Sequence, residues 1–394
     1  MCAGLSAASS SSQLSARAVK TALGLNNLRS VLWLGRAGAM PLLLLACSTA
    51  VPINAGSTVA AGTLSKYTLS VNDPDARLGS VERHFDVAVP WDYAPRGDNL
   101  SAVAEGGGGA SYPLLIYFHG QYGYASYAQG FGTLGAKKGF ITLAPQGLGD
   151  GFPFDLDTTW SVRAEGRTDV CDRVIPQWVM KSCRTVGRVS PCNWATCYDD
   201  VHYVKSLLVA LLVAGVPIDP TRLYISGASN GGIFADYLAS QLPGVFAAAV
   251  PWYGAFLRDY LAPANLTGTS LLSAHGLEDK VIPAGGGESS QHYYYVSQAA
   301  QLGAWAEANG CDAAATNVST PFDGEGRPAM EHWCAEHQRC ATGSVMICRF
   351  PKQAHGFWPS FAERLTWWFA SKRALDGGAG TDAERRARLR ARLV

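Results

Sequence analysis

The chain lacks a charge imbalance and carries little charge of either sign. Its 394 residues include 32 Lys and Arg against 31 Asp and Glu, a formal net charge of +1, and only 16% of them are charged. Nucleic-acid binding relies on a surplus of basic side chains that neutralise phosphates, so no nucleic-acid partner is expected. The basic C-terminal tail, residues 376–394, is a local exception. We expect it to form a solvated, frayed helix, with nucleic-acid or membrane contact as the minor alternative.

Acidic residues are absent before Asp73, in a leading segment that contains an apolar run at residues 40–55. This run is shorter than a comfortable membrane span and suits the core of a signal peptide. We therefore expect residues 1–60 to be a secretory leader, with a misassigned start or a retained anchor as alternatives. The sequence before Cys47 also resembles a bacterial lipoprotein cleavage site. Membrane attachment is expected only if the leader is retained or Cys47 is lipidated.

The C-x2-C spacing that is usual in zinc sites is not found at Cys192 and Cys197. Beyond the leader, eight cysteines remain in two clusters of four: Cys171, Cys183, Cys192 and Cys197, then Cys311, Cys334, Cys340 and Cys348. We expect disulfides within each cluster, with Cys311–Cys340 and Cys334–Cys348 favoured, and no metal or other cofactor. This pattern indicates an oxidising compartment. Sequons at Asn99, Asn265 and Asn317 agree with a secreted glycoprotein.

An internal repeat is also missing, and strand and helix patterns alternate instead. Residues 65–71 and 81–89 have the pattern of an antiparallel pair, and strands at 112–118 and 140–144 flank a helix at 126–138. This order predicts an α/β fold with a mostly parallel sheet and flanking helices, within a single domain at residues 61–375. The other expected elements are helices at 200–213, 289–309 and 358–372, and strands at 223–225, 246–250, 270–274 and 345–350.

Residues 146–198 interrupt this alternation and are rich in Gly, Asp, Trp and Cys. The preceding strand ends at this point, and ligands of open parallel sheets bind beyond the carboxyl ends of the strands. We therefore expect a disulfide-pinned insertion near the active-site edge that sets substrate choice rather than chemistry. The alternative is that it packs away from the cleft and covers the edge of the sheet.

The sequence Gly227-Ala-Ser229-Asn-Gly231 matches G-x-S-x-G. An apolar run that ends at Ile225 precedes it, and a helical pattern follows it. In that context the motif predicts a nucleophile elbow, in which a serine occupies a strained turn between strand and helix.

A serine hydroxyl needs a histidine base and an acid that orients the histidine. In this class of fold the order along the chain is serine, acid, histidine, and the last two follow strands. Asp279 and His355 fit these positions. Glu278 is the rival acid, while Asp199, Asp200 and Asp236 are expected to be helix caps or surface groups. Two histidines are expected to be structural, His119 beneath the oxyanion loop and His275 in the turn after its strand.

The tetrahedral intermediate needs two backbone N–H donors, one from the residue after the nucleophile and one from the loop after the third strand. Asn230 and Gln121 fit these positions. Tyr122, Tyr124 and Trp160 are candidates to line a cleft for an aromatic or sugar substrate, with ordinary core packing as the alternative.

These motifs resemble the α/β-hydrolase family of secreted poly(3-hydroxybutyrate) depolymerase-type and feruloyl or acetylxylan esterases. The resemblance extends from about residue 112 to 372. It implies a secreted serine carboxylesterase that acts on plant cell-wall polysaccharide or polyester esters. Trp358 is the third candidate substrate contact, beside Tyr122 and Trp160. The family often has one residue between its histidine and Trp-Pro, whereas two residues separate His355 from Trp358 here. The matching pieces are His119-Gly120, Gly139-Phe140, Pro145-Gln-Gly147, Asp199-Asp200-Val201, Gly227 to Gly232, His275-Gly276 with Asp279, and His355 near Trp358-Pro359.

Two other functions compete with esterase activity. A serine peptidase would use the same fold and triad, but no propeller or protease-type extension is recognised before the fold. A non-catalytic binding protein on a hydrolase scaffold would not need all three triad groups, and the complete triad favours catalysis.

Overall fold

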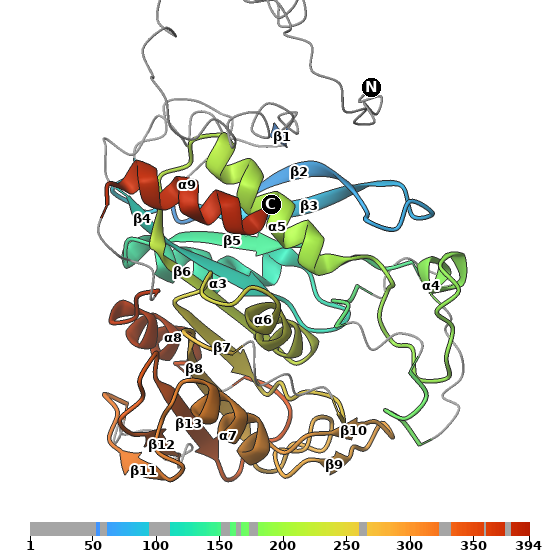
Figure 1. Cartoon of the computed structure of the whole chain (residues 1–394), viewed down its shortest axis with the longest axis vertical. Helices are drawn as coiled ribbons and strands as arrows, with labels where there is room; N and C mark the ends of the chain where they lie inside the picture. The colour runs from blue at the N-terminus through green and yellow to red at the C-terminus, as the bar shows by residue number, and fades with distance from the viewer. Residues whose placement is uncertain are drawn as a thin grey trace, which may run out of the picture. The chain divides into compact units, whose positions relative to one another are not determined.

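We describe a computed structural model of the chain. It describes residues 53–55, 61–93, 111–150, 158–162, 167–172, 180–259, 266–322, 332–357, 360–374 and 380–394. Among these residues, one sheet of eleven strands has the order β1-β2-β3-β5-β4-β6-β7-β8-β13-β12-β11 (Figure 1). Its strands are β1 (Ile53–Ala55), β2 (Ser65–Asn72), β3 (Ser80–Ala88), β4 (Tyr112–Phe118), β5 (Ile141–Pro145), β6 (Ile218–Ala228), β7 (Ala248–Trp252), β8 (Ser270–Gly276), β11 (Ala315–Val318), β12 (Trp333–His337) and β13 (Val345–Phe350).

The centre of the sheet is parallel and its margins are antiparallel. Strands β5, β4, β6, β7, β8 and β13 pair in parallel. Strand β2 pairs antiparallel with β3, and β11 and β12 continue antiparallel from β13. The sequence-based predictions of a mostly parallel sheet and of the antiparallel pair are confirmed.

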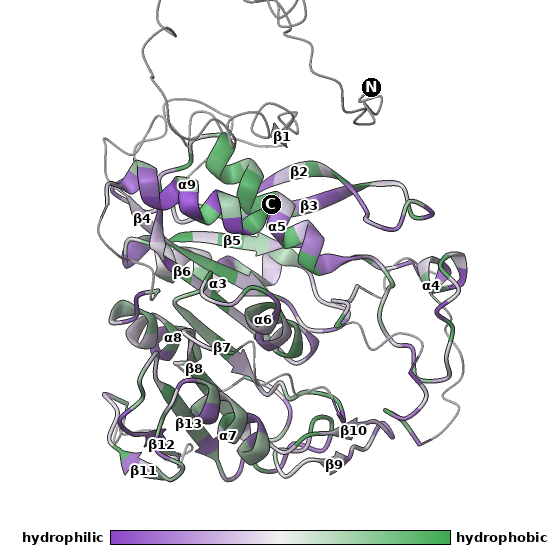
Figure 2. Ribbon diagram, in the orientation of Figure 1, coloured by the Kyte–Doolittle hydropathy of each residue, from purple (hydrophilic) through white to green (hydrophobic). Residues whose placement is uncertain are grey.

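Helices cover both faces of the sheet. Alternate side chains of the central strands point to opposite faces and pack into two different apolar cores. On β4, Leu114 and Ile116 join the core that contains α5 and α6, while Leu115 and Tyr117 join the core that contains α3 and α8. Figure 2 shows the central strands as mainly hydrophobic. The helices are η1 (Ala125–Ala128), α3 (Gln129–Lys137), α4 (Lys181–Thr185), α5 (Asp200–Val213), α6 (Asn230–Gln241), α7 (Gln298–Ala308), α8 (Phe361–Ala370) and α9 (Asp382–Leu393).

The helix expected at residues 289–309 is shorter than predicted. Helix α7 begins after Ser297, whose side chain accepts a hydrogen bond from the N–H of Ala300. The residues before it include two short paired strands, β9 (Gly287–Glu288) and β10 (Tyr294–Tyr295). The run of aromatic and β-branched residues at 293–296 favours extended backbone, which explains the difference.

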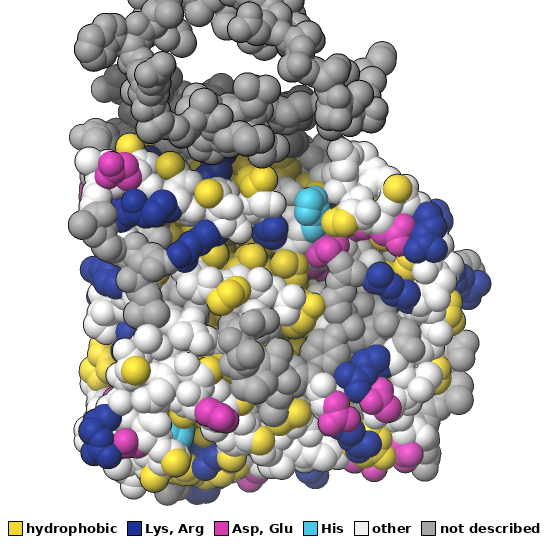
Figure 3. Space-filling view, in the orientation of Figure 1, with side chains coloured by type: hydrophobic (Ala, Val, Ile, Leu, Met, Phe, Trp, Pro, Cys, Tyr) yellow, Lys and Arg dark blue, Asp and Glu magenta, His cyan; other side chains and the backbone are white. Residues whose placement is uncertain are grey.

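The C-terminal tail is not a solvated appendage. A capping box at Thr381 and Glu384 starts α9, and Leu389 and Leu393, four residues apart on one helix face, are buried in the same core as α5. The remaining surface of α9 is largely hydrophilic in Figure 2. On the face seen in Figure 3, basic side chains gather over α9, whereas both signs of charge are scattered elsewhere. The expectation of a frayed, solvated helix was wrong, because the many basic residues of this segment suggest solvation although Leu389 and Leu393 pack into the core.

The two cysteine clusters form four disulfides, which confirms pairing within each cluster. Cys171 pairs with Cys192 and Cys183 with Cys197, while the second cluster pairs Cys311–Cys340 and Cys334–Cys348 as favoured. No helix in the described part of the chain is long and apolar enough to span a membrane.

Candidate active site

Ser229 occupies a strained turn between β6 and α6. Its φ is +56°, a value that non-glycine residues rarely adopt, and its N–H donates to the carbonyl of Trp252 at 3.0 Å. The flanking glycines are required by space. A Cβ atom on Gly227 would lie 2.2 Å from the carbonyl oxygen of Gly231, and one on Gly231 would lie 2.2 Å from that of Phe118. The turn therefore has the backbone geometry that the G-x-S-x-G motif predicts.

Ser229, His355 and Asp279 form a continuous hydrogen-bonded chain. His355 Nε2 lies 2.9 Å from Ser229 Oγ, and His355 Nδ1 lies 2.8 Å from Asp279 Oδ2. Asp279 comes just after β8, and His355 just after β13, so parallel strands bring both groups to the edge that carries Ser229. The rival acid Glu278 is exposed, whereas the Asp279 side chain is fully buried.

The Asp279 carboxylate is surrounded by donors. Its Oδ1 accepts the N–H groups of Val281 and Ile282 at 2.8 and 2.9 Å, and His275 Nε2 lies 3.4 Å from Oδ2. Burial alone would raise the pKa of Asp279, but the hydrogen bonds from His275, His355 and Ile282 outweigh it and leave this pKa below its usual value. The group therefore stays ionised at ordinary pH and can orient His355 Nδ1–H. His275 lies within β8 rather than in the turn after it, and its Nε2 lies 2.7 Å from the carbonyl oxygen of Ile282, which agrees with the expected structural role.

The backbone N–H groups of Gln121 and Asn230 are available beside Ser229. Asn230 is the first residue of α6, where the helix leaves N–H groups free. The loop that carries Gln121 passes close to the serine, since a Cβ atom on Gly120 would lie 3.5 Å from Ser229 Cβ. Neither N–H donates to another group within the described ranges. Both donors are thus free to bind a negatively charged oxygen.

His119 supports this loop as a neutral, buried ring. The N–H of Gly147 donates to His119 Nε2 at 2.9 Å, so the ring proton lies on Nδ1, which donates to the carbonyl of Gly120 at 2.7 Å. Burial lowers the pKa of His119 to about 4. The predicted structural role agrees with this geometry.

Trp160 corrects the sequence-based view of the substrate cleft. Its side chain is fully buried, stacked on Phe234 at 5.2 Å and edge-on to Phe118 at 5.1 Å. It cannot contact substrate directly, and the alternative of core packing is correct. Tyr122 and Tyr124 are exposed. Trp358 lies outside the described residues, as do the aromatic residues of the insertion at positions 152, 154 and 178.

The carboxylates of Asp200 and Asp236 are buried rather than capping or exposed. Asp200 pairs with Arg83 at 2.6 Å. Asp236 lies within α6 and accepts hydrogen bonds from Trp305 Nε1, at 2.9 Å, and from Gln301. Burial raises the pKa of Asp236 to about 7. Only Asp199 has the predicted role, since it caps α5 by accepting the N–H of His202.

A cavity of about 280 Å³ opens beside Ser229 and His355. Tyr253 is central to its wall, because its ring meets the edge of the His355 ring at 4.7 Å and that of Phe357 at 5.4 Å. These lining residues were missed from the sequence, although Tyr253 directly follows β7 and Phe357 follows the histidine. The aromatic lining residues are Tyr117, Tyr127, Phe131, Tyr253, Phe357 and Phe361.

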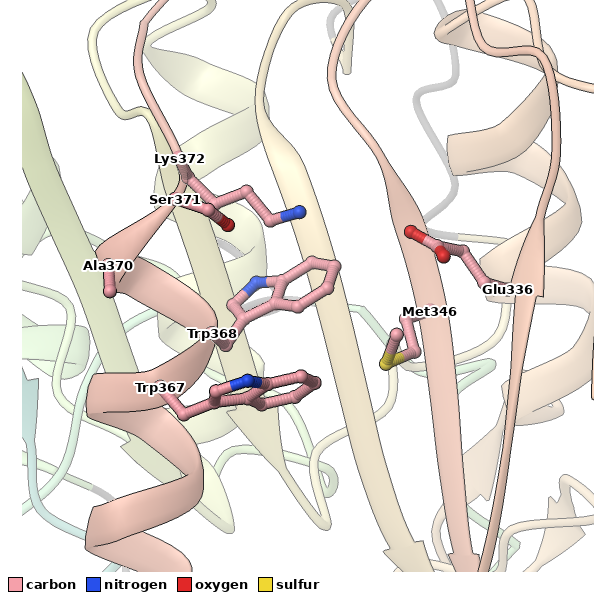
Figure 4. A pocket seen from close by; sticks show the side chains of 7 residues that line it. All are labelled: Glu336, Met346, Trp367, Trp368, Ala370, Ser371 and Lys372. Carbon is pink, nitrogen blue, oxygen red and sulfur yellow. The ribbon is translucent and has the colours of Figure 1, made fainter. Parts of the chain in front are cut away.

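A larger cavity, of about 450 Å³, lies between α8 and strands β12 and β13. Figure 4 shows the indole rings of Trp367 and Trp368 one above the other, across from Met346 and Glu336. The amine of Lys372 lies 3.7 Å from the Trp368 ring centre. The described lining residues of this cavity include no histidine. Across the described chain, no group of three or more His, Cys, Asp or Glu side chains is placed to hold a metal ion.

The parallel sheet with helices on both faces, the strained serine between β6 and α6, and the chain order Ser229, Asp279, His355 define an α/β-hydrolase fold. No protein-family profile matches the chain. Among curated proteins, the chain is similar to "Feruloyl esterase B" of Piromyces equi, with 27% identity over 130 residues. The match covers 31% of this chain and 24% of that relative, so the chain spans about a quarter of the relative's length.

Among solved structures, an acetyl xylan esterase from Aspergillus awamori matches with a TM-score of 0.47 and 13% identity, over 78% of this chain and 99% of that one. An acetyl xylan esterase from Paenibacillus sp. R4 matches with a TM-score of 0.42 and 13% identity, over 82% and 89%. The fold assignment rests on the topology and the geometry of the site.

Proposed function

We propose that this chain is a serine carboxylesterase in which Ser229 is the nucleophile, His355 the general base and acid, and Asp279 the group that orients His355. The observation that carries this proposal is that His355 contacts Ser229 Oγ with one ring nitrogen and Asp279 with the other, at 2.9 and 2.8 Å. This contact favours catalysis over a binding role, because a binding protein would not need a base beside the serine.

In the proposed reaction, Ser229 Oγ attacks the ester carbonyl carbon while its proton passes to His355 Nε2. The carbonyl oxygen becomes an oxyanion that accepts the N–H groups of Gln121 and Asn230. Collapse of this intermediate breaks the ester C–O bond, and His355 returns the proton to the departing alcohol. Water then attacks the acyl-enzyme by the same route, which releases the carboxylic acid and regenerates Ser229.

The aromatic cavity favours an ester with an aromatic acyl group. Rings such as Tyr127, Tyr253 and Phe357 offer edges and faces against which a phenyl ring can pack. The name of the similar curated protein, a feruloyl esterase, agrees with this choice. Acetylxylan and hydroxybutyrate esters are the competing substrates.

Secretion is part of the proposal. Four disulfides are typical of proteins that fold in an oxidising compartment. Of the three sequons, Asn317 is exposed on β11 and accessible for glycosylation, while Asn99 and Asn265 lie outside the described residues. The expected leader at residues 1–60 falls almost entirely outside them too.

The test is a hydrolysis assay of the full chain, produced with its disulfides formed, against p-nitrophenyl acetate, methyl ferulate, acetylated xylan and poly(3-hydroxybutyrate). We expect hydrolysis of p-nitrophenyl acetate, which has an activated leaving group, and, among the three unactivated esters, the fastest hydrolysis for methyl ferulate. A folded, oxidised protein without activity on any of these esters would contradict the proposal. A preference for acetylated xylan or the polyester would retain the chemistry and reject the aromatic acyl group.

A further inference from the structure

Residues 158–160 of the insertion contact the oxyanion-hole loop on both sides of Gln121. Before Gln121, Trp160 Nε1 donates to the carbonyl of His119 at 3.0 Å. After Gln121, the N–H of Tyr122 donates to the carbonyl of Thr158 at 2.9 Å, and Thr158 Oγ1 donates to the carbonyl of Gly123 at 2.7 Å. The loop is thus fixed by the same short segment just before and just after the N–H that is to bind the oxyanion.

The same segment also holds the second donor. The side-chain oxygen of Asn230 accepts the N–H of Trp160 at 2.8 Å, and the side-chain nitrogen of Asn230 donates to the carbonyl of Trp160 at 3.0 Å. This paired contact determines the orientation of the amide, because only one orientation satisfies both groups. It links the start of α6, where the Asn230 N–H is free, to the loop that carries Gln121.

Burial makes this connection rigid. Trp160 and Thr159 have no exposed surface and Thr158 is 7% exposed. Thr159 is held in turn by Leu148, whose carbonyl accepts its N–H at 2.9 Å, and by Thr196, whose N–H donates to Thr159 Oγ1 at 3.1 Å. None of residues 158–160 lines the cavity beside Ser229.

We propose that Thr158 and Trp160 are positioning residues that fix the distance between the two oxyanion-hole donors, so that the insertion acts on chemistry. This inference rests on the proposed esterase function. Donors that are fixed in advance stabilise the charge of the transition state more than that of the bound ester. Loosening the segment should therefore lower kcat and leave KM nearly unchanged, contrary to the sequence-based expectation that the insertion sets substrate choice.

The experiment compares conservative variants with matched controls. Trp160→Phe keeps an aromatic ring beside Phe234 but removes the donor to His119 together with part of the buried indole. Its control is Trp305→Phe, which also removes a buried indole donor. Trp305 Nε1 donates to Asp236 Oδ1 at 2.9 Å, and Trp305 does not line the cavity beside Ser229. Each change leaves a buried acceptor without one of its donors and removes part of a buried indole, so both should reduce stability.

A second pair avoids the large ring. Thr158→Val removes the hydroxyl that donates to Gly123, and Thr269→Val removes a buried hydroxyl that donates to the carbonyl of Phe246 at 3.0 Å. Thr269 does not line the cavity. This pair keeps the inference testable if Trp160→Phe fails to fold.

We expect Trp160→Phe and Thr158→Val to lower kcat about 10- to 100-fold, less than complete removal of an oxyanion donor, with KM changed by less than about threefold. The affinity for an arylboronic acid, which forms a tetrahedral anion on Ser229, should fall in parallel with kcat/KM. The controls should retain kcat and boronate affinity. Equal losses in variants and controls, or a change confined to KM, would overturn the inference.

The boronate also separates this inference from the proposed function. If wild-type protein hydrolyses no ester but its boronate affinity falls in Trp160→Phe and not in Trp305→Phe, the function is wrong and the positioning role stands. If wild-type protein hydrolyses esters and both variants keep full kcat, the function stands and the positioning role is wrong.

Discussion

The cavity beside Ser229 and His355 has a volume of about 280 Å³, whereas the cavity beside Trp367 and Trp368 has about 450 Å³. Both are partly aromatic, and both have a serine hydroxyl on their walls, Ser229 in one and Ser371 in the other. The smaller cavity lies where β4, β6, β7 and β13 end, while the larger one contacts Met346 at the start of β13. Open parallel sheets gather functional groups at the carboxyl ends of their strands.

The two serines differ in their neighbours rather than in the space around them. Ser229 Oγ has His355 Nε2 at 2.9 Å, and the other nitrogen of that ring contacts the buried carboxylate of Asp279. The backbone N–H groups of Gln121 and Asn230 beside it donate to no other group in the described ranges. Lys372, the amine of the larger cavity, lies against the Trp368 ring and donates to Ser344 Oγ at 2.7 Å. The two cavities therefore differ in the histidine beside the serine, and the proposed function rests on that contact rather than on cavity volume.

The largest expected effect separates these two serines. Ser229→Ala should lower kcat for ester hydrolysis by about 10⁶-fold, because it removes the nucleophile of the triad. Ser371→Ala should leave kcat unchanged. Steady-state kinetics on p-nitrophenyl acetate measure both, and near-normal activity of Ser229→Ala would show that Ser229 is not the nucleophile.

The second largest effect on kcat is expected at the acid of the proposed triad. Asp279→Asn should lower kcat by about 10⁴-fold, because an amide cannot stabilise the imidazolium that forms at His355. Glu278→Gln, one residue away on the exposed side of the turn, is the matched control and should have little effect. A damaging Glu278→Gln would mean that the wrong carboxylate has been assigned.

The sequence predicted that Ser229, Asp279 and His355 lie together, and the structure places their side chains within hydrogen-bond distance, because each follows a strand at a position set by the chain order. It failed at Trp160, at Asp236 and along α9, where burial is decided by contacts with distant segments. Trp160 is covered by Phe118 and Phe234, and Leu389 is covered by the core around α5. Local patterns do not report such contacts, so an aromatic residue in an irregular loop is predicted to be accessible and a leucine among arginines is predicted to be solvated.

The third prediction concerns the pH dependence of stability and Asp236, a buried residue that lines neither cavity. Its pKa is raised to about 7 by burial, so between about pH 4 and pH 7 the folded chain keeps a proton that the unfolded chain has released. The free energy of unfolding should therefore fall as pH rises through this window. Asp236→Asn, which does not titrate, should remove that fall and be more stable than wild type at pH 8 by about 1–4 kcal/mol.

Gln301 makes this substitution compatible with the site. Its Oε1 has no hydrogen-bond partner in the described part of the chain, and a rotation of its amide would let it accept from the new Asn side chain. Denaturant unfolding of both proteins at pH 5 and pH 8 tests the prediction. The same pH slope in the two proteins would exclude Asp236 as its source.

The smallest effect concerns substrate preference. Tyr127 is 65% exposed and lines the smaller cavity. Tyr127→Ala should raise KM for methyl ferulate by about 3- to 10-fold, the value of one aromatic contact, and change KM for p-nitrophenyl acetate much less. Trp367→Ala, in the larger cavity, should alter neither value. Equal changes for both esters would remove Tyr127 from the acyl pocket.

Covalent labelling with an organophosphate tests most directly that the smaller cavity is the catalytic one. The reagent reacts only with a serine whose hydroxyl is activated by a base, so peptide mapping by mass spectrometry should find the phosphoryl group on Ser229 alone. The label should disappear in His355→Ala. Modification of Ser371 or another serine, or labelling of Ser229 that persists without His355, would contradict the assignment.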